Sequence, residues 1–207
     1  MNISVPGCCL IIGQQGSGKS YLLKYFIYKN RSILKYGIVF SHTAFNEGNL
    51  DYLPKKYIYS DYQPDKAYNL MKIQESLPKE KRHLAFIILD DCVYDKWTTC
   101  KYFKRMITQL RHYNILVIIC AQYANKIPPD IRENCFQACL FNLSTKNSIE
   151  AAYESYGQKF ESYTDFKNFL LENTKDRNFI FYNKLDNEKP YKISKAPPKI
   201  PRFRLKY

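Results

Sequence analysis

The feature that most constrains this chain is a glycine-rich octapeptide near its start, GQQGSGKS, at residues 13–20. It matches the pattern G-x-x-x-x-G-K-[ST] of the phosphate-binding P-loop. An apolar run of strand length, residues 8–12, comes directly before it. Apolar residues at helical spacing follow it: Leu22, Leu23, Phe26 and Ile27. The motif therefore joins a predicted buried strand to a predicted amphipathic helix, which is the context that a P-loop requires.

Each residue type in this loop suits the binding of a triphosphate. Glycines let the backbone turn sharply, so that free N–H groups and the helix dipole converge on an anion. Lys19 supplies a cation for the β- and γ-phosphates, and the Ser20 hydroxyl is placed to bind Mg²⁺. We therefore predict an ATP and Mg²⁺ site. Its nucleotide-binding residues are Gly13, Gln14, Gln15, Gly16, Ser17, Gly18, Lys19, Ser20 and Tyr21.

Two acids, Asp90 and Asp91, follow the continuous apolar run at residues 84–89. Such a run is typical of a strand buried on both faces of a parallel sheet, and open α/β sheets build their sites at the carboxyl ends of strands. The pattern matches a Walker B motif. We predict that Asp90 holds Mg²⁺ and that Asp91 is the catalytic carboxylate that polarises the attacking water. The alternative is a strand that runs out into a solvated turn.

A third apolar run, residues 115–121, ends at Gln122. An amide at the end of a strand beside a nucleotide site can orient the attacking water or sense the γ-phosphate. We predict a catalytic role for Gln122, together with Asp91 and Lys19, and an ordinary loop residue is the alternative.

The pattern as a whole predicts an α/β fold class with a mainly parallel sheet flanked by helices. The length of 207 residues suits one domain, which we place at residues 1–188. Residues 189–207 are rich in proline and basic residues and are expected to extend as a tail rather than fold. Further strands are predicted at 37–41, 57–59, 138–142 and 179–182, and helices at 63–77, 99–113, 127–134, 147–156 and 163–172.

Charge and cysteine content indicate the class of binding partner and the cellular compartment. With 32 Lys+Arg against 19 Asp+Glu, the net charge of +13 favours contact with nucleic acid over an anionic membrane, although a Lys-rich surface alone would give the same balance. The seven cysteines show no metal-binding spacing and are expected to be buried thiols in a reducing compartment. No signal peptide and no apolar run of membrane-spanning length is visible, so we expect a cytoplasmic protein without membrane insertion.

The order of these motifs resembles a known group of proteins. The P-loop, the Asp90–Asp91 pair and the strand that ends at Gln122 are joined by two flanking segments, RHYN at residues 111–114 and IPPDIREN at residues 127–134. FSHT at residues 40–43, with Asn46 downstream, adds to the likeness. Together they resemble the genome-packaging ATPases of the FtsK/HerA superfamily, of the poxvirus and giant-virus type. The likeness covers about Leu10 to Asn142.

The resemblance implies a P-loop NTPase of the RecA-like (ASCE) kind, with an extra strand between the P-loop strand and the Walker B strand. It also implies a homo-oligomeric ring of five or six subunits that translocates double-stranded DNA, with capsid or portal proteins as further partners. Each site would be completed by a neighbour's arginine, for which Arg111 is the first candidate and Arg132 and Arg105 are the others. The location implied is the host cytoplasm, a viral assembly site or the virion.

Three functions remain open at this stage. The first is an ATP-hydrolysing motor that packages a viral genome by translocating DNA. The second is a nucleoside or nucleotide kinase, whose P-loop looks similar but which would need an arginine-rich lid. The third is a non-translocating DNA-binding switch or loader ATPase.

Overall fold

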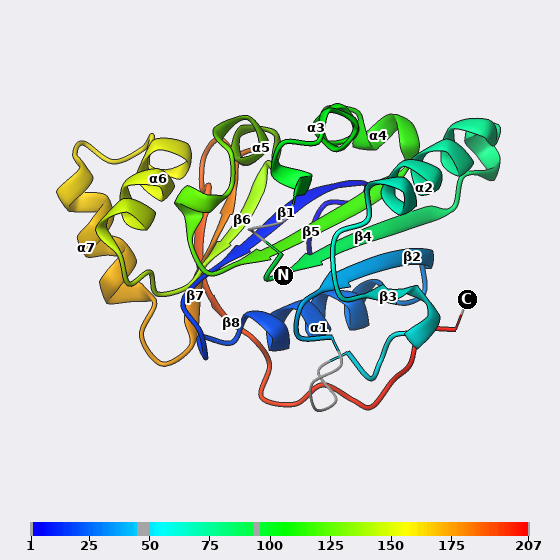
Figure 1. The fold of residues 1–207 in the computed structure, drawn as a ribbon. Helices are drawn as coiled ribbons and strands as arrows, with labels where there is room; N and C mark the ends of the chain where they lie inside the picture. Colours follow the sequence, from blue (N-terminus) through cyan, green and yellow to red (C-terminus); the bar gives the residue numbers. More distant parts are fainter. Residues whose placement is uncertain (1, 45–49, 93–95, 207) are drawn as a thin grey trace.

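The computed structural model describes residues 2–44, 50–92 and 96–206. Within them, an eight-stranded sheet has the order β3-β2-β4-β5-β1-β6-β7-β8 (Figure 1). The first six strands in this order, β3, β2, β4, β5, β1 and β6, pair in parallel. At the β6 side of the sheet, β7 pairs antiparallel with β6, and β8 pairs antiparallel with β7. The bounds are β1 Gly7–Ile12, β2 Leu34–Ser41, β3 Ile58–Tyr59, β4 Leu84–Asp90, β5 Ile115–Ala121, β6 Gln137–Leu140, β7 Asn178–Asn183 and β8 Tyr191–Lys195. The predicted α/β class is confirmed, and β5 is the extra strand between β1 and β4.

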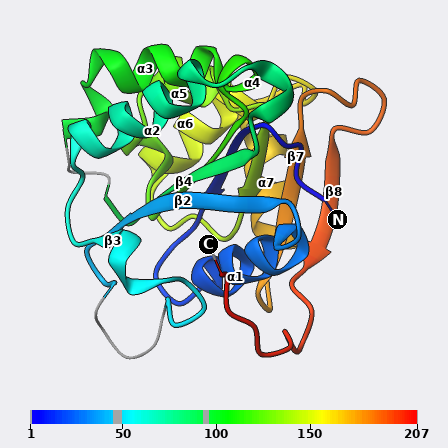
Figure 2. The same ribbon diagram turned by 90° about the vertical axis from the view of Figure 1, so that its right-hand side faces the viewer.

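Helices cover both faces of the sheet. Helix α1 lies under one face, and the group from α2 to α5 lies over the other (Figures 1 and 2). The bounds are α1 Lys19–Asn30, α2 Pro64–Ser76, α3 Lys101–Thr108, α4 Leu110–Tyr113, α5 Pro129–Asn134, α6 Lys146–Tyr156 and α7 Tyr163–Asn173. The single helix predicted at 99–113 is in fact two, because the backbone leaves the helical region at Gln109 (φ −126°, ψ 20°).

The strands with continuous apolar runs serve two cores at once. In β4, Ile87 and Leu89 face the core shared with α2 to α5, whereas Phe86 and Ile88 face the core shared with α1. All seven residues of β4 are buried, as are all seven of β5. Because side chains alternate along a strand, a strand buried on both sides needs an apolar residue at every position. This is why the runs at 84–89 and 115–121 have no polar interruptions.

The segment predicted to be an unfolded tail is instead part of the fold. Residues 191–195 form β8, which pairs with β7. Residues 196–206, which we call the strap, then cross the α1 side of the molecule (Figure 1). Phe203 packs with its ring centroid 5.3 Å from that of Tyr28 and 5.3 Å from that of Tyr52, and Leu205 is buried. Two apolar residues after the last proline therefore attach the strap to the body, although the segment as a whole is basic and rich in proline.

The cysteines also differ from expectation. Cys8 in β1 and Cys135 after α5 are joined by a disulfide, with their Cα atoms 4.7 Å apart. The expectation of buried thiols is wrong for this pair, because β6, which begins at Gln137, lies beside β1 and brings two distant residues together. Cys9, Cys92, Cys120 and Cys139 are buried and form no disulfide among the described residues, as expected. No helix in the described ranges has the length and apolar character needed to cross a membrane.

Candidate nucleotide site

The P-loop starts where three strands end. Gly13 N–H donates to Ala121 O at the end of β5 (3.1 Å), and Gln14 N–H donates to Asn142 O beyond β6 (3.1 Å). At Gly13, a Cβ atom would stand 2.4 Å from Cβ of Phe141, so no larger residue fits there. Gly18, which precedes α1, has φ of 108°, a value that side chains disfavour. The predicted glycine positions are therefore required by close packing at one end of the loop and by backbone conformation at the other.

Lys19 occupies the interior of this loop. Its side chain is 6% exposed, and its Nζ donates to Gly13 O (2.8 Å) and Gln14 O (3.2 Å). Ser20, the next residue, is exposed in the first turn of α1, where free backbone N–H groups also point. The loop backbone, the Lys19 ammonium and the start of α1 thus lie together, with Ser20 next in the chain, which is the arrangement that binds phosphate groups.

The two carboxylates follow β4 at the same edge of the sheet. Asp90 is 4% exposed and accepts a hydrogen bond from the Ser41 hydroxyl (3.2 Å). Burial, with a smaller effect of the neighbouring Asp91 charge, raises the pKa of Asp90 to about 6, although Ser41 and Lys19 oppose the shift. Asp91 has φ of 55°, and its Oδ1 is buried without a hydrogen-bond partner among the residues described. Of the two, Asp90, which is buried and accepts a hydrogen bond from Ser41, fits a ligand of a hard cation such as Mg²⁺.

Strand register explains how residues far apart in the chain meet. In the β1–β5 ladder Ile12 pairs with Ala121, and in the β4–β5 ladder Asp90 pairs with Cys120. Gln122 therefore follows β5 at the level where the P-loop leaves β1, and it is half-buried there. The structure brings together at this edge the predicted residues Gly13, Gln14, Gln15, Gly16, Ser17, Gly18, Lys19, Ser20, Asp90, Asp91 and Gln122, with Tyr21 on the exposed side of α1.

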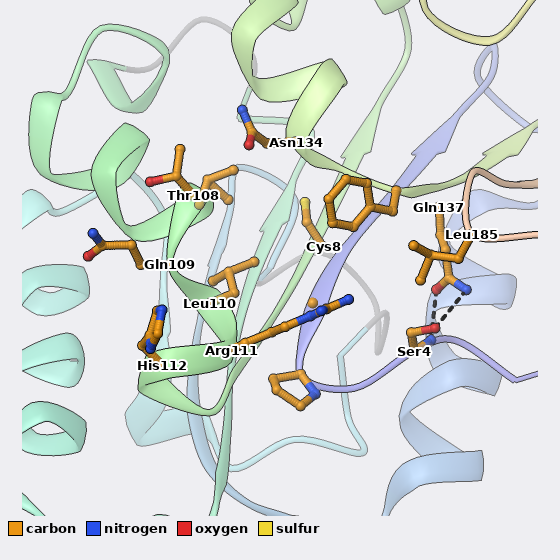
Figure 3. A pocket seen from close by; sticks show the side chains of 14 residues that line it. Ser4, Cys8, Thr108, Gln109, Leu110, Arg111, His112, Asn134, Gln137 and Leu185 are labelled. Atoms are coloured by element: carbon orange, nitrogen blue, oxygen red, sulfur yellow. Dashed lines mark hydrogen bonds between the residues drawn. The ribbon is translucent and has the colours of Figure 1, made fainter. Parts of the chain in front are cut away.

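Arg111 lies at the opposite end of the parallel strands, where β5 begins. It belongs to α4, before β5 begins, and the seven residues of β5 separate it from Gln122 by roughly 20 Å. Figure 3 shows its side chain across a pocket of about 260 Å³, pointing to the side where Ser4 and Gln137 bond to each other. Arg111 therefore does not meet the P-loop of its own chain.

Arg132 is committed to the interior. It is 4% exposed, and its guanidinium donates to the Ser155 hydroxyl (2.8 Å) and to the carbonyls of Ala124 (3.2 Å) and Ile127 (2.6 Å). It also contacts the Glu154 carboxylate at 3.4 Å. These bonds hold the turn after β5 against α6. By contrast, Arg105 is exposed on α3.

We expect Arg132→Ala to lower the free energy of unfolding by roughly 3 kcal/mol, because the Ile127 carbonyl and the Ser155 hydroxyl would lose the guanidinium donor and the Ala124 carbonyl would lose one of its two donors. Urea denaturation followed by circular dichroism measures this change. Arg105→Ala is the matched control and should change stability by less than about 0.5 kcal/mol. If the two variants are equally stable, Arg132 does not hold this turn.

Several residues of this region were not assigned by sequence reasoning. Ser41, which donates to Asp90, ends β2 as Asp90 ends β4, and the pattern of polar residues at strand ends could have indicated it. Phe141 lies against Gly13 and Gly18, but in the sequence it is one more apolar residue of the strand predicted at 138–142. Asn46 of the resemblance lies outside the described residues.

The fold and this site define a P-loop NTPase of the RecA-like class. A family model described as Poxvirus A32 protein matches residues 6–159, and the chain belongs to this family. Relatives include the uncharacterized protein 075L of Invertebrate iridescent virus 6, which is 28% identical over 83% of this chain and 68% of its own length. The DNA packaging protein OPG160 of Vaccinia virus is 26% identical over 70% of this chain and 57% of its own length.

Solved structures support the same fold. The genome packaging NTPase B204 of Sulfolobus turreted icosahedral virus 2, in complex with sulfate, superposes with a TM-score of 0.72 and 19% identity. The match covers 96% of this chain and 100% of B204. The complex of B204 with ATP-gammaS superposes with a TM-score of 0.66 and 20% identity. The similarity thus extends over nearly the whole of both chains.

Proposed function

We propose that this protein is an ATP-hydrolysing motor that translocates double-stranded DNA and so packages a viral genome into a capsid. The observation that carries the proposal is a complete set of Walker residues, Lys19, Asp90 and Asp91, in a member of the Poxvirus A32 family. A relative in this family is named a DNA packaging protein. The kinase alternative has no comparable support from the family.

Each side chain of the site has its own role in this proposal. Lys19 and the N–H groups of the loop hold the β- and γ-phosphates. Ser20 and Asp90 would hold Mg²⁺, which neutralises phosphate charge when bound. Asp91, whose Oδ1 is buried without a hydrogen-bond partner among the described residues, draws the proton of the attacking water. Gln122, half-buried at the end of β5, orients that water.

Arg111 would act on the site of a neighbouring subunit in a ring of five or six copies. Arg111 is exposed and lies far from its own P-loop, so a role in ATP hydrolysis would be at the site of a second chain. A guanidinium is suited to the role because it carries a fixed charge and can stabilise the transferring phosphoryl group through two bonds.

We expect Arg111→Ala and Lys19→Ala each to lose hydrolysis by about 1,000-fold when alone, and mixtures of the two to regain a measurable fraction. In a mixed ring, the Lys19→Ala subunit offers Arg111 to a neighbour with an intact P-loop. Steady-state ATP hydrolysis at several mixing ratios measures this. Arg105→Ala, the other exposed candidate, is measured in parallel and should keep its activity if Arg111 is the residue that acts in trans. Failure of the mixtures to recover, with assembly intact, would remove Arg111 from this role.

The motor function is tested by ATP hydrolysis with and without long double-stranded DNA, at low and moderate salt. We expect DNA to stimulate ATP hydrolysis several-fold and the stimulation to fade as salt rises. The reason is that basic side chains, in excess by a net charge of +13, would contact the phosphate backbone, and salt screens such contacts. Hydrolysis indifferent to DNA would support the switch or loader ATPase instead. Capsid or portal proteins are the further partners that we propose, in the cytoplasm of the host, at a viral assembly site or in the virion.

A further inference from the structure

A second hollow lies beside the phosphate cradle. It has a volume of about 220 Å³, and its lining includes Gly18, Tyr21, Phe141, Arg177, Lys195 and Pro197. Gly18 is shared with the P-loop, so the hollow continues from the place where phosphates would bind. Its other walls come from the end of β6, from the turn before β7 and from the start of the strap.

We propose that this hollow binds the base and ribose of a purine nucleoside triphosphate, with the strap as one wall. The inference rests on the proposed nucleotide site and adds to it the part of the ligand that the Walker motifs do not contact. The walls are of the type that holds a flat ring. Tyr21 is 38% exposed, and Phe141, whose ring is 3.6 Å from a Cβ built at Gly18, forms the floor.

The charged groups of the hollow are donors. Arg177 and Lys195 carry N–H groups and no acceptors, and both are exposed. A purine presents ring nitrogens as acceptors, and a guanidinium plane also stacks on a base. Arg177 is presented by a tight turn, in which Asn178 N–H donates to Lys175 O (2.9 Å) and both central residues have positive φ, 54° at Asp176 and 62° at Arg177. An arginine in this conformation is disfavoured by about 1 kcal/mol, so the turn is held by its surroundings.

The strap wall is fixed at both ends. Lys195 ends β8, and Leu205 N–H donates to Tyr52 O (2.9 Å). Between these points, Pro197 and Pro198 restrict the backbone because their rings lock φ. A wall that is already ordered costs little conformational entropy when a ligand binds. The strap therefore serves the nucleotide site rather than only covering α1.

The test compares the affinity for a ligand that has a nucleobase with the affinity for a ligand that lacks one. Isothermal titration calorimetry, with Mg²⁺ present, gives dissociation constants for ATP-gammaS and for inorganic tripolyphosphate. We expect Arg177→Ala and Tyr21→Ala each to weaken ATP-gammaS binding about tenfold and to leave tripolyphosphate binding within about twofold. Tyr21→Phe, which keeps the ring, should bind like the unchanged protein. Lys175→Ala, in the same turn but outside the hollow, is the matched control.

The outcomes separate this proposal from the proposed function. Arg177→Ala and Tyr21→Ala could weaken the binding of both ligands equally, or the binding of neither. Either result would show that the nucleobase does not bind in this hollow, while the P-loop site and the motor function stand. If the unchanged protein binds neither ligand, the nucleotide site itself fails and the inference fails with it. Thermal melting of each variant shows whether a loss of binding reflects unfolding.

Discussion

Lys19→Ala is expected to weaken ATP binding by at least about 100-fold. Lys19 is 6% exposed, and its ammonium donates to Gly13 O and Gln14 O, so the charge is already positioned at the loop where the phosphates would lie. Charge-assisted hydrogen bonds from a buried ammonium to phosphate contribute about 3 kcal/mol, which corresponds to this loss. Calorimetric titration with ATP-gammaS measures it.

Lys29→Ala is the control for this variant, because Lys29 is an exposed lysine on the same helix. It removes the same charge and should bind ATP-gammaS within about twofold of the unchanged protein. Equal binding by the Lys19→Ala and unchanged proteins would show that the loop does not hold the phosphates through this ammonium.

Asp91→Asn is expected to bind ATP normally and to hydrolyse it about 100- to 1,000-fold more slowly. The amide has nearly the shape of the carboxylate but cannot draw a proton from water, and proton transfer by a positioned base contributes a factor of this size. The left-handed backbone at Asp91 (φ 55°) tolerates asparagine better than most residues, so folding should be preserved. Steady-state hydrolysis together with ATP-gammaS affinity separates the two effects.

The matched control is Asp130→Asn, which neutralises an exposed carboxylate on α5 at a distance from the site. Its hydrolysis rate should stay within about twofold. Normal turnover by Asp91→Asn would remove the assignment of the catalytic carboxylate and leave Asp90 or Gln122 as the group that acts on water.

Much of the site was predictable because its parts are local. The P-loop is a continuous octapeptide, and Asp90, Asp91 and Gln122 each follow an uninterrupted apolar run. Parallel strands end at a common edge, so polar residues after such runs were expected to converge. The register of β1, β4 and β5 confirms that they do.

The roles of the three arginines could not be distinguished from local sequence. In the sequence, Arg111, Arg132 and Arg105 are three basic residues near predicted helices, and nothing local separates them. In the structure, Arg132 is buried with four partners, whereas Arg111 is exposed at the edge opposite the P-loop. Burial depends on which helices pack together, and hydrophobic periodicity does not specify that choice.

By itself, the sequence determined the class of fold, the phosphate cradle and the carboxylates at the strand ends, because these depend on residues that are neighbours in the chain. Tertiary structure alone decided the rest. Ser41 meets Asp90 across 49 residues, Cys8 meets Cys135 across 127, and the strap meets Tyr52 through Phe203 and Leu205. The first two contacts follow from the order of strands in the sheet, and the third from the course of the strap over the α1 side; both are set by the packing of the whole chain.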